Sequence, residues 1–200
     1  MMQSKSHAPI LFVVFSVFWL LLAINPLYRE VWLVENLILM VCAAYLLRSY
    51  KKYPFSNRAY WMIFIFCILQ TIGAHYTYAE VPLGFWVADW LDIERNHYDR
   101  LVHFAFGFLV ILPFKEVMVR KVVFSTRAIE IFTLVMLFIG ISGSYEVVES
   151  WYAILYEQDK ASDMFLGSQG DIWDAEKDMA LAGLGAWLYL QFFDARSAHY

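Results

Sequence analysis

Two pairs of ionisable residues have the spacing that places side chains on one face of a helix. Asp99 and His103 are four residues apart, and Glu146 and Glu149 are three apart. Carboxylates and imidazoles act as general acids or bases, and together they also ligate divalent cations. These residue types predict acid–base or metal chemistry, with His103, Asp99 and Glu146 as the catalytic candidates.

Further ionisable residues reach the same depth of the membrane when the chain is divided into spans. His75 closes the third span, and Asp171, Asp174 and Asp178 follow i, i+3, i+7 spacing at the start of the sixth. An oxygen-rich set with one or two imidazoles suits magnesium, manganese, calcium or zinc without choosing among them. The hypothetical cation site comprises His75, Asp99, His103, Glu146, Glu149, Asp171, Asp174 and Asp178.

Several members of this set also have a purely structural interpretation. Asp99, Asp171 and Asp174 are residues of the type that caps helix N-termini. A simple hydrogen bond between helices would account for His103, and a place at the water interface would account for Glu149. The convergence of many such groups on one side is what favours a polar site, because ionisable groups in a membrane are costly without partners.

The elements that must position these residues are membrane-spanning helices. Apolar residues make up 61% of the 200-residue chain and charged residues 17%, which is more apolar than a soluble domain of this size. We therefore predict an all-α fold, a single integral membrane domain built as a multi-pass transmembrane helical bundle of about six spans. The six apolar segments are 8–24, 31–47, 59–77, 98–118, 129–151 and 174–193.

Small residues on the polar spans predict close packing of those helices. Gly107 lies below His103 on its span, and Gly140 and Gly143 lie near the carboxylates of the fifth span. Gly185 follows the acidic residues of the sixth span. Such residues allow helix backbones to approach closely, which would draw the polar faces together.

The distribution of basic residues predicts the orientation of the bundle. Ten Lys and Arg residues fall on one side of six alternating spans and five on the other, and the richer side is expected in the cytoplasm. Both termini are then cytoplasmic, and the ionisable set faces outward. The poorer side carries Arg29, Arg95, Arg100, Lys160 and Lys177; the richer side carries Lys5, Arg48, Lys51, Lys52, Arg58, Lys115, Arg120, Lys121, Arg127 and Arg196.

Composition also limits the classes of partner. The net charge of -4 and the lack of a long basic run exclude a nucleic-acid partner. Cys42 and Cys67 fall in apolar segments without a ligand spacing, so they predict neither a disulfide framework nor a zinc site. The predicted partner is the lipid bilayer, with a lipid-linked or phospholipid headgroup as a candidate ligand.

Several motifs resemble the YjdF family of bacterial inner-membrane proteins. The resemblance covers nearly the whole chain and implies an inner-membrane location, but that family has no established activity to transfer. The motifs are His75-Tyr76-Thr77-Tyr78, Tyr98-Asp99-Arg100-Leu101-Val102-His103-Phe104, Tyr145-Glu146 with Glu149, and Gly170-Asp171-Ile172-Trp173-Asp174 through Lys177-Asp178-Met179.

A more distant resemblance is to VanZ-type proteins, which are associated with glycopeptide resistance by an unknown mechanism. Arg100 stands where these proteins often carry Lys, and Asp178 stands where they commonly carry Asn. The second difference argues against identical chemistry, so resistance is not transferred. The positions that match the VanZ pattern are Asp99, His103, Glu146 or Glu149, Asp171 and Asp174.

The leading functional hypothesis is a membrane protein that binds a cation or a polar lipid or envelope-precursor headgroup in this outward-facing set. The alternative is a metal-assisted hydrolase or transferase that acts on a lipid-linked substrate, although no familiar catalytic signature is present. Transport is ranked lowest, because the inner halves of the spans are nearly free of ionisable residues and Gln70 is one of few polar groups there.

Overall fold

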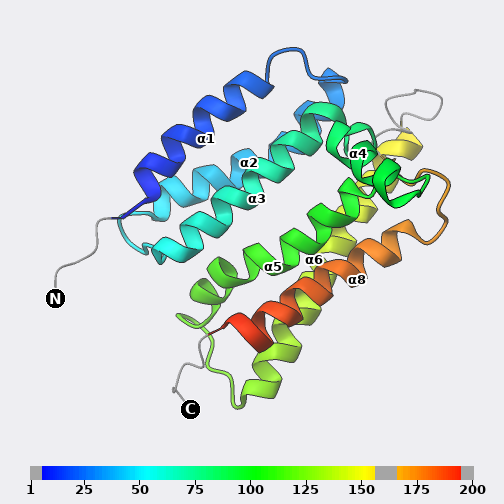
Figure 1. Ribbon diagram of the computed structural model, residues 1–200. Helices are drawn as coiled ribbons and strands as arrows, with labels where there is room; N and C mark the ends of the chain where they lie inside the picture. Colours follow the sequence, from blue (N-terminus) through cyan, green and yellow to red (C-terminus); the bar gives the residue numbers. More distant parts are fainter. Residues whose placement is uncertain (1–5, 156–165, 195–200) are drawn as a thin grey trace.

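The computed structural model describes residues 6–155 and 166–194, in which every regular element is a helix (Figure 1). Pro9 and Pro82 lie in the first turns of α1 and α4, where a missing N–H costs nothing. The elements in chain order are α1 (Ala8–Leu22), α2 (Arg29–Ser49), α3 (Asn57–Tyr76), the short 3₁₀ helix η1 (Tyr78–Glu80), α4 (Pro82–Leu91), α5 (Tyr98–Met118), α6 (Arg127–Leu155), α8 (Asp174–Leu188) and the π-helical turn η2 (Tyr189–Phe193).

Four of the described helices, α2, α3, α5 and α6, are long and apolar enough to cross a membrane. Helix α1 is apolar but has only 15 residues, or about 22 Å against the roughly 30 Å of hydrocarbon. Helix α8 has 15 residues and continues through the five of η2, which restores the crossing length. The predicted all-α bundle of about six spans is confirmed; the largest boundary difference is in α6, which extends to Leu155 rather than to residue 151.

The helices define two ends of the bundle. At the acidic end, α3 and α6 finish and α5 and α8 begin; at the basic end, α1 begins and η2 finishes (Figure 1). Lys5, Lys160 and Arg196, which contributed to the predicted orientation, lie outside the described residues.

Helix α5 is the centre of the packing, with α8 and α3 against it, α6 against α8, and α1 and α2 against α3. A side chain at Gly107 would meet the backbone of Ala182, and one at Gly185 would meet the backbone of Phe104. The two glycines therefore hold α5 and α8 at backbone contact, as their sequence positions predict. Gly140 is different: it faces open space, so the expectation that it draws helices together is wrong.

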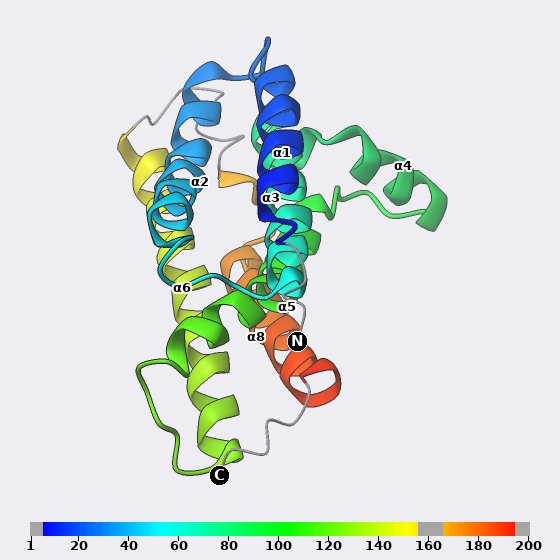
Figure 2. The ribbon, with the colours of Figure 1, turned by 90° about the vertical axis from the view of Figure 1, so that its left-hand side faces the viewer.

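Helix α4, in the connection between α3 and α5, was not predicted. It carries several of the aromatic residues of that connection. It projects sideways from the bundle beside the acidic end (Figure 2). Trp86 and Trp90 are 69% and 83% exposed, whereas Gly84 packs against Asn96. Asn96 anchors this connection by donating to the carbonyls of Ala79 and Val81, both at 3.0 Å. A short helix with exposed tryptophans at the end of the spans suits the membrane interface.

The basic end contains an ion-pair network that the sequence analysis missed. Lys115 Nζ lies 3.0 Å from Glu130 Oε1 and 2.5 Å from Asp194 Oδ2. Arg127 contacts the same two carboxylates, at 2.7 and 2.8 Å. Two buried charges thus lie in the inner halves of α5 and α6, contrary to the expectation that this region is nearly free of ionisable residues. They are mutually paired, so they tie α5 and α6 to the end of η2.

Candidate functional site

The first turns of α5 and α8 bring three ionisable side chains together at the acidic end. One donor atom each of Asp99, His103 and Asp178 lies within 4.8 Å of the others. His103 Nε2 is 3.5 Å from Asp99 Oδ1, across one turn of α5. All three residues are buried, Asp178 to 1% exposure. The backbone contact of α5 with α8, one to two turns deeper, is what places Asp178 opposite His103.

Helix α6 supplies two more groups to the same histidine. Glu146 Oε1 lies 3.3 Å from His103 Nε2, and Ser142 Oγ lies 2.9 Å from His103 Nδ1. Ser142 is one turn from Glu146 and is 2% exposed. Sequence reasoning missed Ser142; its i, i+4 spacing to Glu146 was the available signal. We call Asp99, His103, Glu146 and Asp178 the carboxylate–histidine cluster.

Asp178 is the least compensated member of this cluster. Neither of its carboxylate oxygens has a hydrogen-bond partner among the residues that the structure describes, and both are fully buried. Glu146 Oε1 also makes no hydrogen bond within the described part of the chain, despite its 3.3 Å ion-pair distance to His103. Buried acceptors without donors are unusual, and each such site calls for an explanation such as a bound ion or water.

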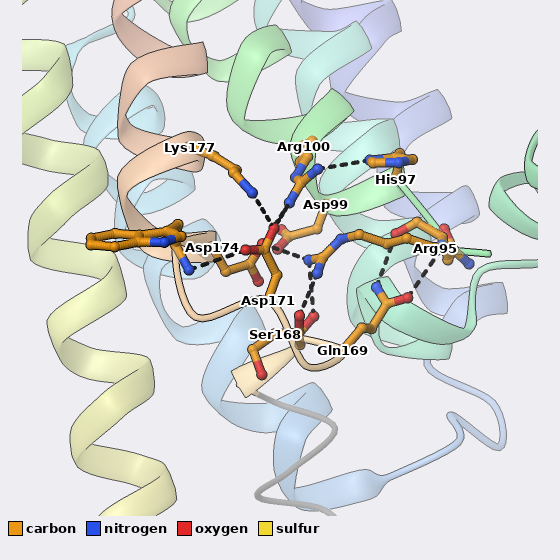
Figure 3. Close-up of polar contacts among 12 residues, drawn as sticks. Arg95, His97, Asp99, Arg100, Ser168, Gln169, Asp171, Asp174 and Lys177 are labelled. Carbon is orange, nitrogen blue, oxygen red and sulfur yellow. Dashed lines mark hydrogen bonds and ion pairs between the residues drawn. The ribbon is translucent and has the colours of Figure 1, made fainter. Parts of the chain in front are cut away.

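Beside this cluster, at the starts of α5 and α8 and in the segments that precede them, lies a network of paired charges, shown in Figure 3. Arg95 donates to Asp174 Oδ1 at 2.5 Å, and Arg100 lies 3.4 Å from the same atom. Arg100 also pairs with Asp171, and Lys177 Nζ lies 2.5 Å from Asp171 Oδ2. We call these five residues the loop clasp; each of them has an oppositely charged partner within the set. Asp171 and Asp174 therefore have internal counter-charges, unlike Asp178.

The loop clasp also joins the two connections that cover the acidic end. Arg95 donates to the carbonyls of Ser168 and Gly167, and the Gln169 side chain makes two hydrogen bonds with the Asn96 backbone, at 3.0 and 2.9 Å (Figure 3). Gln169 has a positive φ of 47°, a conformation held by these bonds. The segment before α8 is thereby fixed against the segment before α5.

Two groups in this outer layer have shifted pKa values. The hydrogen bond from Lys177, followed by that from the Trp173 N–H, holds the pKa of Asp171 well below its usual range. Partial burial, and then the charges of Arg100 and Arg95, lower the pKa of His97. Asp171 is therefore ionised at neutral pH and His97 is neutral, so Asp171 keeps the negative charge that pairs with Arg100 and Lys177.

Another buried carboxylate, Glu35 of α2, was missed by the sequence analysis. Its Oε2 accepts hydrogen bonds from Gln70, Tyr78 and Tyr145 at 2.5 to 3.1 Å. The signal that could have found it was an ionisable residue seven positions into an otherwise apolar helix. Gln70 therefore serves this carboxylate near the acidic end, rather than standing in the inner half as expected.

Two predicted residues, Glu149 and His75, remain to be placed. Glu149 is 4% exposed and lies in electrostatic range of Glu35, Asp99, Glu146 and Asp178. It is therefore electrostatically coupled to both the Glu35 network and the carboxylate–histidine cluster. His75 is not brought to the cluster: its Nδ1 lies 2.7 Å from the Leu22 carbonyl, at the turn between α1 and α2.

Comparisons with known proteins identify relatives of the chain. Residues 8–199 match the family described as "Predicted membrane protein (DUF2238)". The chain is 39% identical over 155 residues to the inner membrane protein YjdF of Escherichia coli (strain K12), an alignment that covers 78% of this chain and 73% of that protein. No solved structure matches. The VanZ resemblance finds no support in these matches and stays a prediction.

These matches agree with the resemblance inferred from the motifs around His75, Asp99, Glu146 and Asp171. Similarity to an inner-membrane protein, together with the long apolar helices, supports a multi-pass protein of the bacterial inner membrane. With a family match over nearly its full length, this chain belongs to the DUF2238 family of predicted membrane proteins.

Proposed function

We propose that the protein binds a divalent cation in the carboxylate–histidine cluster, with Asp99, His103 and Asp178 as ligands and Glu146 beside them. The observation that carries this proposal is the pair of buried oxygens on Asp178, which have no hydrogen-bond partner among the described residues. One of them lies within 4.8 Å of the donor atoms of Asp99 and His103. Metal–ligand distances are about 2.0–2.6 Å, so small side-chain movements bring all three donors onto one ion.

The charge of the surroundings favours a cation over an anion. Arg95, Arg100 and Lys177 are already paired with Asp171 and Asp174. The cluster contributes three carboxylates and one imidazole, and buried like charges repel strongly unless a cation offsets them. The same carboxylates would repel a phosphate, which disfavours an anionic lipid headgroup inside the cluster itself.

Ser142 supports the histidine as a ligand. When His103 Nδ1 carries the proton it donates to Ser142 Oγ, 2.9 Å away, and Nε2 keeps its lone pair toward Asp99. Outer hydrogen bonds of this kind fix the tautomer and orientation of metal-bound histidines. The donor set suits magnesium, manganese, calcium or zinc.

The count of basic residues indicates which side of the membrane the proposed cation site faces. We propose that the acidic end faces outward and that both termini are cytoplasmic, because ten of the fifteen Lys and Arg residues fall on the other side of six spans. The cation would then be taken from outside the cytoplasm, and the loop clasp would lie over its entrance.

Chelator-treated protein in detergent should gain stability when the bound ion is returned. At about one hundred times the dissociation constant, the gain in free energy of unfolding is about 2.7 kcal/mol. Asp178→Asn should be at least as stable as the wild type without metal, because it removes an unpaired buried charge, yet should not respond to metal. Thermal unfolding with magnesium, manganese, calcium and zinc measures both effects.

The control is Asp89→Asn, since Asp89 is an exposed acid on α4 that should leave the response to metal unchanged. A wild type that no ion stabilises, or an Asp178→Asn protein that responds as the wild type does, would disprove cation binding at this cluster.

A hydrolase or transferase is the second candidate, favoured by the contact of Ser142 with His103. A hydroxyl 2.9 Å from an imidazole whose other nitrogen faces Asp99 and Glu146 has the connectivity of an activated serine nucleophile. If this candidate is right, a fluorophosphonate probe labels Ser142, and Ser142→Ala abolishes the label. The cation proposal predicts no labelling above that of Ser142→Ala, because Ser142 then serves only to orient His103.

A further inference from the structure

A groove on the bilayer-facing side of α8 combines two cations with an apolar floor. It has a volume of about 430 Å³ and is lined by Arg100, Lys177, Ala180, Leu181 and Leu184. The four α8 residues follow i, i+3, i+4, i+7 spacing and so form one helix face. This face is separate from the face of Asp178, Ala182 and Gly185, which is buried against α5.

The groove is charged at the acidic end and apolar deeper in the bundle, as a phospholipid in the outer leaflet is charged at its headgroup and apolar along its chains. Lys177 is in the first turn of α8 at the acidic end, and Leu184 lies seven residues, or about 10 Å, deeper. A phosphate at the level of Arg100 and Lys177 would therefore have hydrocarbon chains beside Leu181 and Leu184. Arg and Lys are the side chains that bind phosphate through charge-assisted hydrogen bonds.

The contacts of Asp171 show where Arg100 and Lys177 could bind a phosphate. Arg100 and Lys177 both contact its Oδ2, so the two cations already converge on one anionic oxygen. A phosphate oxygen beside that point meets two donors and competes with a single carboxylate. The loop clasp as a whole has three cations for two carboxylates, Asp171 and Asp174.

We propose that this groove binds an anionic phospholipid, with the phosphate on Arg100 and Lys177 and an acyl chain along Ala180, Leu181 and Leu184. The site goes beyond the cation site, with which it shares no residue. Asp99 and Arg100 are neighbours in the sequence, as are Lys177 and Asp178; in each pair the aspartate belongs to the buried cluster and the cation to the loop clasp that borders the groove. The proposed cation and phospholipid sites therefore use adjacent faces of the same helix turns.

Native mass spectrometry of the full chain in detergent tests this, with phosphatidylglycerol and phosphatidylcholine of identical chains as the probes. The wild type should retain phosphatidylglycerol preferentially, and the double variant Arg100→Gln/Lys177→Gln should retain it about tenfold less. Asp171→Asn should increase the retention of phosphatidylglycerol, because this substitution removes the carboxylate that competes with the phosphate for Arg100 and Lys177. Inorganic phosphate at equal concentration should not displace the lipid, because the apolar floor contributes to binding.

Controls separate this site from the cation site. Arg29→Gln removes an arginine at the acidic end that instead donates to the Ala23 carbonyl, and it should leave retention unchanged. Asp178→Asn should also retain phosphatidylglycerol. Should the double variant fail to fold, Leu184→Trp, which fills the floor from a bilayer-exposed position, should lower retention by itself.

Equal retention of the two lipids by the wild type would overturn the proposal. Loss of phosphatidylglycerol in Asp178→Asn but not in the groove variants would also overturn it and would place the headgroup at the cluster. If inorganic phosphate alone displaced the lipid, the proposal would also be overturned, because the groove would then be a site for a free anion rather than for a phospholipid. A groove variant that loses lipid yet keeps its response to metal would show the two sites to be independent.

Discussion

Replacing Gly185 by leucine should prevent α5 and α8 from packing, with a loss of about 3 kcal/mol or more in the free energy of unfolding. A Cβ at this position meets the backbone oxygen of Phe104 and the backbone of Phe108. Backbone atoms in a helix cannot rotate away as a side-chain end can, so the helices must separate. Because the α5–α8 contact positions Asp178 opposite His103, Gly185→Leu should also abolish cation binding.

Gly140→Leu is the matched control, on the neighbouring helix α6. A Cβ at Gly140 meets nothing within 4 Å, and leucine is the better helix former by up to about 1 kcal/mol. Thermal unfolding in detergent, followed by circular dichroism, should therefore show a large loss for Gly185→Leu and none for Gly140→Leu. Similar losses for both variants would mean that the α5–α8 contact is not specifically tight.

Arg95→Met is expected to lower the free energy of unfolding by about 3 kcal/mol, in the range for breaking a buried ion pair. The side chains of Arg95 and Asp174 are 13% and 9% exposed and lie 2.5 Å apart, so solvent screens the pair little. The substitution leaves Asp174 with Arg100 at 3.4 Å and removes the donor to the Ser168 and Gly167 carbonyls. The segment before α8 should then detach from the segment before α5.

Limited proteolysis and thermal unfolding measure these two consequences together. Lys121→Met, at an exposed position of the basic end, is the control and should change stability by less than about 0.5 kcal/mol. Arg95→Lys should recover only part of the loss, because one ammonium group cannot replace a planar fork that reaches a carboxylate and two carbonyls. Protease resistance equal to that of the wild type in Arg95→Met would show that the loop clasp does not hold these segments.

The spans could be predicted from sequence because the bilayer imposes their length and apolarity. A segment such as 98–118 must satisfy its backbone hydrogen bonds internally and present apolar side chains to lipid, and α5 has those bounds. The roles of Gly107 and Gly185 followed from the same reasoning. Gly140 was misassigned, since a glycine by itself does not show which face of its helix meets a neighbour.

The members of the site could be predicted only in part, because pairing depends on rotation and depth. Asp171, Asp174 and Asp178 have the same residue type and regular spacing, yet two are paired with cations and one has no partner among the described residues. Ser142 is a small polar residue whose i, i+4 spacing to Glu146 is a weak signal, and its role becomes clear only when His103 is placed beside it. Glu35 was overlooked because its partners come from three other elements, and no spacing on α2 reveals them.

The central claim, a cation held by Asp178 and its neighbours, is tested most directly by metal content. The protein would be saturated with each candidate ion, desalted in detergent and analysed by plasma mass spectrometry beside Asp178→Asn, His103→Ala and Asp89→Asn. We predict close to one ion per chain in the wild type and in Asp89→Asn, and loss of that ion in the other two. A folded wild type without bound metal, or Asp178→Asn with an undiminished amount, would contradict the account.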